Sequence, residues 1–138
     1  MEEFITHNEK ETLEVARKFA SSLSSGDIVL LNGDLGAGKT VFTKGIVGEL
    51  SNGKIVAVSP TFVIVNAYDT LPVVNHFDLY RINDVSELEA IGIEEYLYSD
   101  SINIVEWSER AIELFPQDSI VVEIIKIDDD TRKIRIGR

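Results

Sequence analysis

The sequence contains no cysteine, and its 13 lysine and arginine residues are outnumbered by 24 aspartate and glutamate residues. Without cysteine the chain cannot form disulfides, thiolate zinc sites, iron–sulfur clusters or a cysteine nucleophile. No apolar run approaches the roughly 18 residues that a membrane-spanning helix needs. The N-terminus, Met1-Glu2-Glu3-Phe4, is acidic and has no signal-peptide pattern. We therefore expect a cytoplasmic protein that does not act at a membrane.

The net charge, 13 − 24 = −11, argues against direct nucleic-acid binding as the main activity, because phosphate backbones repel an acidic surface. An acidic protein can still serve a nucleic-acid pathway through a basic partner. With 138 residues, of which 44% are hydrophobic, and no repeat, low-complexity stretch or linker, we expect a single domain over residues 1–138.

Hydrophobic spacing and turn residues predict alternating strands and helices. Asn8 and Glu11 form a capping box at the start of a helix over residues 9–24. An apolar strand over 28–31 runs into a glycine-rich loop and a second helix over 39–50. The other expected elements are strands over 55–58, 61–68, 73–80, 102–105, 120–127 and 132–136, and helices over 84–98, interrupted near Gly92, and over 108–114. This mixture predicts an α/β fold whose mixed sheet has parallel core strands and antiparallel additions, with helices on both faces.

The loop between the first strand and the second helix, GDLGAGKT, matches the phosphate-binding pattern G-x-x-x-x-G-K-[ST]. Its glycines allow phosphate oxygens to approach the backbone, and its N–H groups form an anion nest at a helix N-terminus. A chance match in a chain of this length has odds of roughly half a per cent. We expect ATP and Mg²⁺ to bind here, in a P-loop NTPase-like fold, through Gly33, Asp34, Leu35, Gly36, Ala37, Gly38, Lys39, Thr40 and Val41. Lys39 would reach the β- and γ-phosphates, and Thr40 would offer its hydroxyl to magnesium.

Two carboxylates compete to hold the metal or to orient water, because each follows an apolar strand. Glu106 ends the strand over 102–105, and Asp78 lies on the polar face of the strand over 73–80. Each also has a structural interpretation: Asp78 could pair with Arg81, and Glu106 could cap the following helix.

Three other features leave alternatives open. The segment Ser59-Pro60-Thr61 could sense the γ-phosphate or simply begin a strand. Arg81 could act as an arginine finger within the chain or form a surface ion pair. Trp107 could pack on a ligand or in the core. His7 and His76 are too isolated in the sequence to predict a metal site.

Four motifs together resemble the bacterial TsaE family, called YjeE in older usage. They are GDLGAGKT, SPTF at 59–62, HFDLYR at 76–81 and VEW at 105–107. Only the first is shared with P-loop proteins generally, and the resemblance spans residues from about 9 to 138. It implies an ATPase required for N6-threonylcarbamoyladenosine in tRNA, the modified base beside the anticodon. TsaE-like proteins act on the TsaB–TsaD pair, in which TsaD transfers the threonylcarbamoyl group, and ATP hydrolysis is thought to reset that complex.

The resemblance also assigns roles to individual residues. Lys39 and Thr40 correspond to the phosphate lysine and the magnesium hydroxyl, and Glu106 to the magnesium-associated acid. Asp78 corresponds to a second essential acid that orients water or acts indirectly. Ser59-Pro60-Thr61 corresponds to the switch segment. The family holds adenine between its N-terminal segment and its C-terminal strands, which suggests Ile5, Thr6, Glu9 and Arg132.

Residues 82–118 carry ten acids and one base, Arg110, so this segment has a charge of 1 − 10 = −9. This acidic surface either meets basic groups of the partner complex or is a solvated helix face. The tRNA would be reached only indirectly.

Three other functions share parts of the same pattern. A small-molecule kinase usually needs a lid with several arginines, and no pair of the six arginines lies close together in a mid-chain segment. A GTPase would carry an N-K-x-D motif, which is absent. An adaptor that binds nucleotide without hydrolysing it would have the same residues, and would differ in whether water is aligned for attack.

Overall fold

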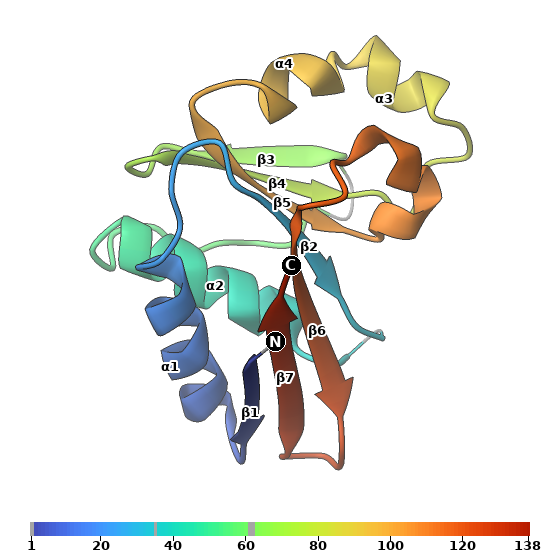
Figure 1. Cartoon of the computed structure of the whole chain (residues 1–138). Coiled ribbons are helices and arrows are strands. Elements are labelled where there is room, and N and C mark those ends of the chain that lie inside the picture. Colours follow the sequence, from blue (N-terminus) through green and yellow to red (C-terminus); the bar gives the residue numbers. More distant parts are fainter. Residues whose placement is uncertain (1, 35, 61–62) are drawn as a thin grey trace.

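The computed structural model describes residues 2–34, 36–60 and 63–138, and it contains one seven-stranded sheet (Figure 1). The strand order is β1-β7-β6-β2-β5-β4-β3. The strands are β1 (Glu2–Thr6), β2 (Ile28–Asn32), β3 (Val65–Tyr68), β4 (Val73–Asp78), β5 (Ser101–Glu106), β6 (Ile120–Lys126) and β7 (Arg132–Gly137). The helices are α1 (Glu9–Ala20), α2 (Lys39–Leu50), α3 (Ser86–Ala90), α4 (Ile93–Leu97) and a 3₁₀ helix, η1 (Ser108–Leu114).

The centre of the sheet is parallel and its two ends are antiparallel. Strand β2 pairs in parallel with β5 and β6, and β5 pairs in parallel with β4. The hairpins β3–β4 and β6–β7 add antiparallel pairs, and β1 pairs antiparallel with β7. The predicted fold class is confirmed. The parallel strands end at one edge of the sheet, and ligands of such folds bind outside the carboxyl ends of the strands.

Helices cover both faces of the sheet, as predicted (Figure 1). On one face α1 packs against α2, where the rings of Phe19 and Phe42 lie 5.8 Å apart. The helices approach closely because Gly45 faces Ala16: a Cβ added to Gly45 would lie 2.5 Å from the Ala16 Cβ. The other face is covered by α3, α4 and η1, and its core cluster is centred on Phe77, Leu88 and Ile93.

The predicted start of α1 is confirmed, but its predicted end is wrong. Asn8 accepts a hydrogen bond from the Glu11 N–H, and Glu11 accepts one from the His7 N–H, which completes the capping box. The helix ends at Ala20 rather than at residue 24. The hydroxyls of Ser21 and Ser22 donate to carbonyls of the last turn, so they compete with continued helix.

The predicted strand over residues 55–58 is wrong. This segment crosses the surface without joining the sheet, and Val56 and Val58 are 72% and 60% exposed. Instead of ladder bonds, the Val58 N–H donates to the Tyr68 hydroxyl at 2.9 Å, and that hydroxyl donates to the Val58 carbonyl. The strand predicted over 61–68 begins only at Val65, with residues 61 and 62 outside the described part.

Two further comparisons with the prediction concern strand β1 and the break between α3 and α4. Strand β1 was not predicted from the sequence, and it forms the sheet edge beside β7. The interruption predicted near Gly92 is confirmed, because Gly92 has φ +73° between α3 and α4. Within the described residues, none of the helices has the length and apolar character to cross a membrane.

Candidate functional site

The phosphate-loop residues lie between the carboxyl end of β2 and the N-terminus of α2, the context that the motif requires. Gly36 and Gly38 have φ values of +80° and +110°, which residues with a side chain rarely adopt. Gly33 is needed for space: an added Cβ would lie 2.8 Å from the Ile124 carbonyl oxygen on β6. Gly38 caps α2 without a side chain of its own, so the first N–H groups of that helix face the loop. This arrangement suits an anion.

The Lys39 side chain is buried and contacts two groups beyond the loop. Its Nζ lies 3.9 Å from Oε1 of Glu106 and 4.4 Å from the centroid of the Trp107 ring. Only 7% of Lys39 is exposed. A buried ammonium is stabilised by an opposite charge and by an aromatic face, so the structure holds this cation at the loop.

The two predicted acids lie side by side. Asp78 and Glu106 are register partners at the ends of β4 and β5. Glu106 is buried, and its Oε2 lies 2.5 Å from Nε2 of His76. Asp78 is half-buried, and its Oδ1 accepts a hydrogen bond from the Tyr80 N–H at 2.9 Å. Neither acid is placed as a helix cap, since the residue before η1 is Trp107.

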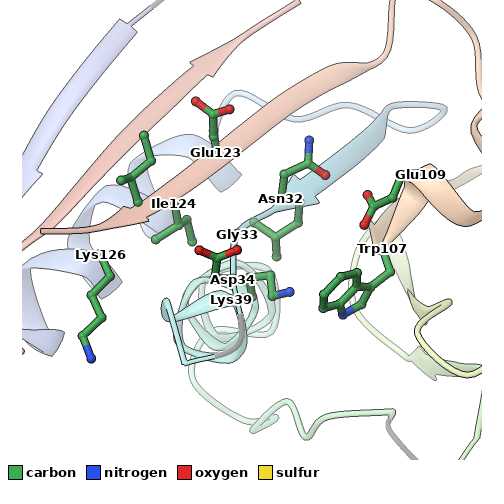
Figure 2. A pocket seen from close by; sticks show the side chains of 11 residues that line it. Asn32, Gly33, Asp34, Lys39, Trp107, Glu109, Glu123, Ile124 and Lys126 are labelled. Atoms are coloured by element: carbon green, nitrogen blue, oxygen red, sulfur yellow. The ribbon is translucent and has the colours of Figure 1, made fainter.

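A cavity of about 390 Å³ opens beside these groups (Figure 2). Figure 2 shows the Lys39 ammonium and the Trp107 indole pointing toward each other, with Glu123 and Ile124 on the strand opposite. The lining residues are Leu31, Asn32, Gly33, Asp34, Lys39, Trp107, Glu109, Glu123, Ile124, Ile125 and Lys126. Gly33 and Asp34 of the phosphate loop, Lys39, and Trp107 therefore line one concave surface.

Trp107 packs against the core, one of the two interpretations that its sequence position left open, and packing on a ligand stays a prediction. Its backbone has φ +60°, an uncommon conformation for a residue with a side chain. Its ring packs on Tyr80 with centroids 4.9 Å apart, and the guanidinium of Arg110 lies 5.7 Å from the Tyr80 ring. Trp107 thus borders both the apolar cluster under η1 and the ammonium of Lys39.

Arg132 lies on the outer side of the phosphate loop. Its Nε donates to the Ala37 carbonyl at 2.8 Å, and its Nη1 donates to the Asp128 carbonyl at 2.7 Å. These bonds tie the β6–β7 turn to the loop. In that turn the Thr131 and Asp130 N–H groups donate to the Asp128 carboxylate and hold its pKa below the usual value.

A second cavity, of about 190 Å³, lies on this side of the loop. Five residues predicted to contact the nucleotide line it together: Glu9, Ala37, Gly38, Val41 and Arg132. Asn8, Thr12, Asp129 and Asp130 complete the lining. Ile5 and Thr6 are not among its lining residues: Ile5 is 53% exposed, and the Thr6 hydroxyl bonds with that of Thr12.

Several predicted site residues remain without a structural test. Leu35 and Thr61 lie outside the described residues. Ser59 is exposed and Pro60 is buried, which does not distinguish a phosphate sensor from a turn. Arg81 is exposed, so both interpretations of it stay open.

The metal site proposed from the sequence has suitable donors. Glu106 supplies a carboxylate and Thr40, in the first turn of α2, supplies a hydroxyl. Mg²⁺ prefers oxygen ligands and is usually held by one or two carboxylates together with substrate phosphates. No group of three or more histidine or acidic side chains that could hold a metal occurs among the described residues. A nucleotide-dependent magnesium site, which needs few protein ligands, fits this donor set.

Sequence reasoning missed His76, which it regarded as isolated. The residue is 1% exposed and bonded to Glu106, 30 residues away in the chain. The available signal was the alternation of His76 and Asp78 on one face of β4, the face on which Glu106 also lies.

Comparisons with known proteins agree with one another. The family model described as "Threonylcarbamoyl adenosine biosynthesis protein TsaE" matches residues 6–134. Proteins named tRNA threonylcarbamoyladenosine biosynthesis protein TsaE include one from Bacillus subtilis, 40% identical over 94% of this chain and 80% of that protein. Another, from Aquifex aeolicus, is 39% identical over 100% of this chain and 97% of that protein. The crystal structure of Bacillus subtilis YdiB superposes with a TM-score of 0.80 and 32% identity, covering 99% of this chain and 84% of that one.

Proposed function

This chain belongs to the TsaE family, and on that basis we propose that it binds and hydrolyses ATP in the formation of N6-threonylcarbamoyladenosine in tRNA. It acts on a TsaB–TsaD partner complex and reaches tRNA only through that complex, in the cytoplasm. The observation that carries the proposal is the convergence of Lys39, Glu106 and Asp78 at the carboxyl edge of the sheet, beside the phosphate loop.

The loop residues bind the phosphates. The positive-φ glycines Gly36 and Gly38 turn the backbone so that its N–H groups form a nest. The helix dipole of α2 adds a partial positive charge at the same point. The Lys39 ammonium, now shared between Glu106 and Trp107, moves to the β- and γ-phosphates when they arrive, because their charge exceeds that of one carboxylate.

Thr40 and Glu106 would hold the metal. Mg²⁺ would supply positive charge that neutralises the phosphates, a main requirement of phosphoryl transfer. Glu106 is suited to this role because it is buried at the site and its backbone is fixed by β5. A carboxylate on a strand keeps its position better than one on a loop.

Asp78 orients the attacking water. It lies directly opposite Glu106 and is more exposed, so solvent reaches it. The bond from the Tyr80 N–H fixes the orientation of its carboxylate and leaves capacity for further hydrogen bonds, since an ionised carboxylate has about four lone-pair sites. Glu106 therefore serves the metal, and Asp78 serves the attacking water.

The test is ATP hydrolysis by the purified protein, alone and with the TsaB–TsaD pair, with GTP as the control nucleotide and Lys39→Ala as the inactive control. We expect slow turnover alone that rises strongly with the pair and only for ATP. Turnover independent of the pair would favour a small-molecule kinase with residual ATPase activity. ATP binding without turnover in either condition would favour the adaptor.

A further inference from the structure

We propose that His76 is a positioning residue that holds Glu106 in the orientation needed for the nucleotide-dependent metal. This inference rests on the proposed function, and it assigns a role to a buried histidine that neither the phosphate-loop motif nor the pair of acids uses. His76 does not itself contact the nucleotide.

The strand register brings the two side chains together. His76 on β4 is the register partner of Ile104 on β5, and Glu106 lies two residues further along β5. Residues two apart on a strand project from the same face. His76, Asp78 and Glu106 therefore share one face of the sheet, on which Val74 and Ile104 pack with α2.

The two oxygens of Glu106 have different partners. Oε2 lies 2.5 Å from Nε2 of His76, while Oε1 lies 3.9 Å from Nζ of Lys39. The first contact is a hydrogen bond, and the second is a longer ion pair. When Lys39 turns to the phosphates, the bond from His76 still fixes Glu106, so the carboxylate keeps one orientation in both states.

The hydrogen bond also determines which tautomer the imidazole adopts. An ionised carboxylate only accepts hydrogen bonds, so Nε2 must carry the proton. Nδ1 is buried and has no hydrogen-bond partner among the described residues. A proton on Nδ1 would therefore be a buried donor without an acceptor, which is costly. His76 thus donates from Nε2 to Glu106.

Packing alone does not account for a histidine at this position. The residue is 1% exposed, and Val74 on its own face of β4 and its register partner Ile104 on β5 are fully buried and apolar. An apolar side chain of similar size would fill the space without leaving Nδ1 unpaired. The polar ring contributes what such a side chain lacks, a donor to Glu106. Hydrogen-bond partners of metal ligands typically change metal affinity or activity by about 10–100-fold when they are removed.

The experiment compares His76→Gln with His76→Asn and His76→Phe. The glutamine amide nitrogen reaches about as far as Nε2, the asparagine amide does not, and phenylalanine keeps the ring without a donor. Glu106→Gln serves as the reference. Calorimetry measures the affinity of a non-hydrolysable ATP analogue in excess Mg²⁺ and again in EDTA. The ratio of the two affinities is the gain due to the metal, and thermal unfolding checks that each variant folds.

We expect His76→Asn and His76→Phe to lower the gain due to Mg²⁺ about 10-fold or more, while affinity in EDTA stays near that of the wild type. His76→Gln should retain most of the gain. Equal losses in all three variants, or a loss that appears equally in EDTA, would overturn the positioning role. A gain that survives Glu106→Gln would overturn the assignment of the metal acid. Failure of the wild type to bind the analogue would overturn the proposed function and this inference with it.

Discussion

Asp78 and Glu106 lie directly opposite each other at the carboxyl ends of two adjacent parallel strands. Glu106 is buried and bonded to His76, whereas Asp78 is half-buried and its carboxylate accepts a hydrogen bond from the Tyr80 N–H. Two neighbouring carboxylates in such different surroundings are suited to different tasks.

The different surroundings predict that isosteric amides at the two positions separate binding from turnover. Asp78→Asn should cut hydrolysis about 10³-fold, the scale of a lost phosphoryl-transfer component, and leave Mg²⁺-dependent ATP affinity intact. Glu106→Gln should lower both. Turnover and calorimetric affinity in Mg²⁺ measure the two effects. If both variants keep their turnover, the acids that do this work lie elsewhere.

Replacing the two glycines within helix α2 by alanine should change the stability of the protein in opposite directions. An added Cβ at Gly45 would meet the Ala16 Cβ at 2.5 Å, whereas at Gly48 it would meet nothing within 4 Å. Gly45→Ala should destabilise the protein by about 1–3 kcal/mol through overpacking. Gly48→Ala should stabilise it by about 0.5–1 kcal/mol through helix propensity. Chemical denaturation measures both, and equal effects would contradict the close packing of α1 on α2.

Trp107 is the single tryptophan of the chain, so its fluorescence reports on the site. Its ring faces the Lys39 ammonium at 4.4 Å. We expect ATP with Mg²⁺ to change the emission, because the ammonium moves from the indole to the phosphates. Lys39→Met should shift the starting emission and abolish the change. A full response in Lys39→Met would mean that the indole senses something other than this lysine.

The acidic surface predicts salt-dependent binding to the partner complex. Glu89, Glu94 and Glu95 are exposed on α3 and α4. Glu87 is exposed as well, but its carboxylate accepts bonds from the Asn83 and Asp84 N–H groups, so its reversal would also disturb α3. Reversing the other three to lysine should weaken binding to TsaB–TsaD, most at low salt. Unchanged affinity across salt concentrations would indicate a solvated face.

The phosphate loop and α2 were predictable because local chemistry determines them. The glycines, Lys39 and Thr40 follow an apolar strand, and α2 begins and ends at the residues that the sequence predicts. Strand β1 could not be found this way, since the five residues Glu2–Thr6 include two glutamates and pair only through β7 in the described sheet. Ile55, Val56 and Val58 are β-branched and apolar, so the segment resembles a strand, but it pairs with none of the strands in the described sheet.

The sequence predicted the site residues that belong to a local motif. It did not predict the contacts that depend on how the strands pair. Asp78 and Glu106 could be named as strand-end acids, but their direct opposition depends on the β4–β5 register. The contact of His76 with Glu106 depends on the same register. The bond from Arg132 to the Ala37 carbonyl joins residues 95 apart, and the sequence assigned that arginine to adenine only by resemblance.

The tie between Arg132 and the loop links the nucleotide site to the outermost strand of the molecule. Arg132 is the first residue of β7, and its Cα partner is Thr6 at the end of β1. A fusion or truncation that pulls β1 away would loosen β7 and, through it, the carbonyl of Ala37. Displacing β1 is therefore expected to lower ATP affinity through β7 and Arg132, at a distance from the phosphates themselves.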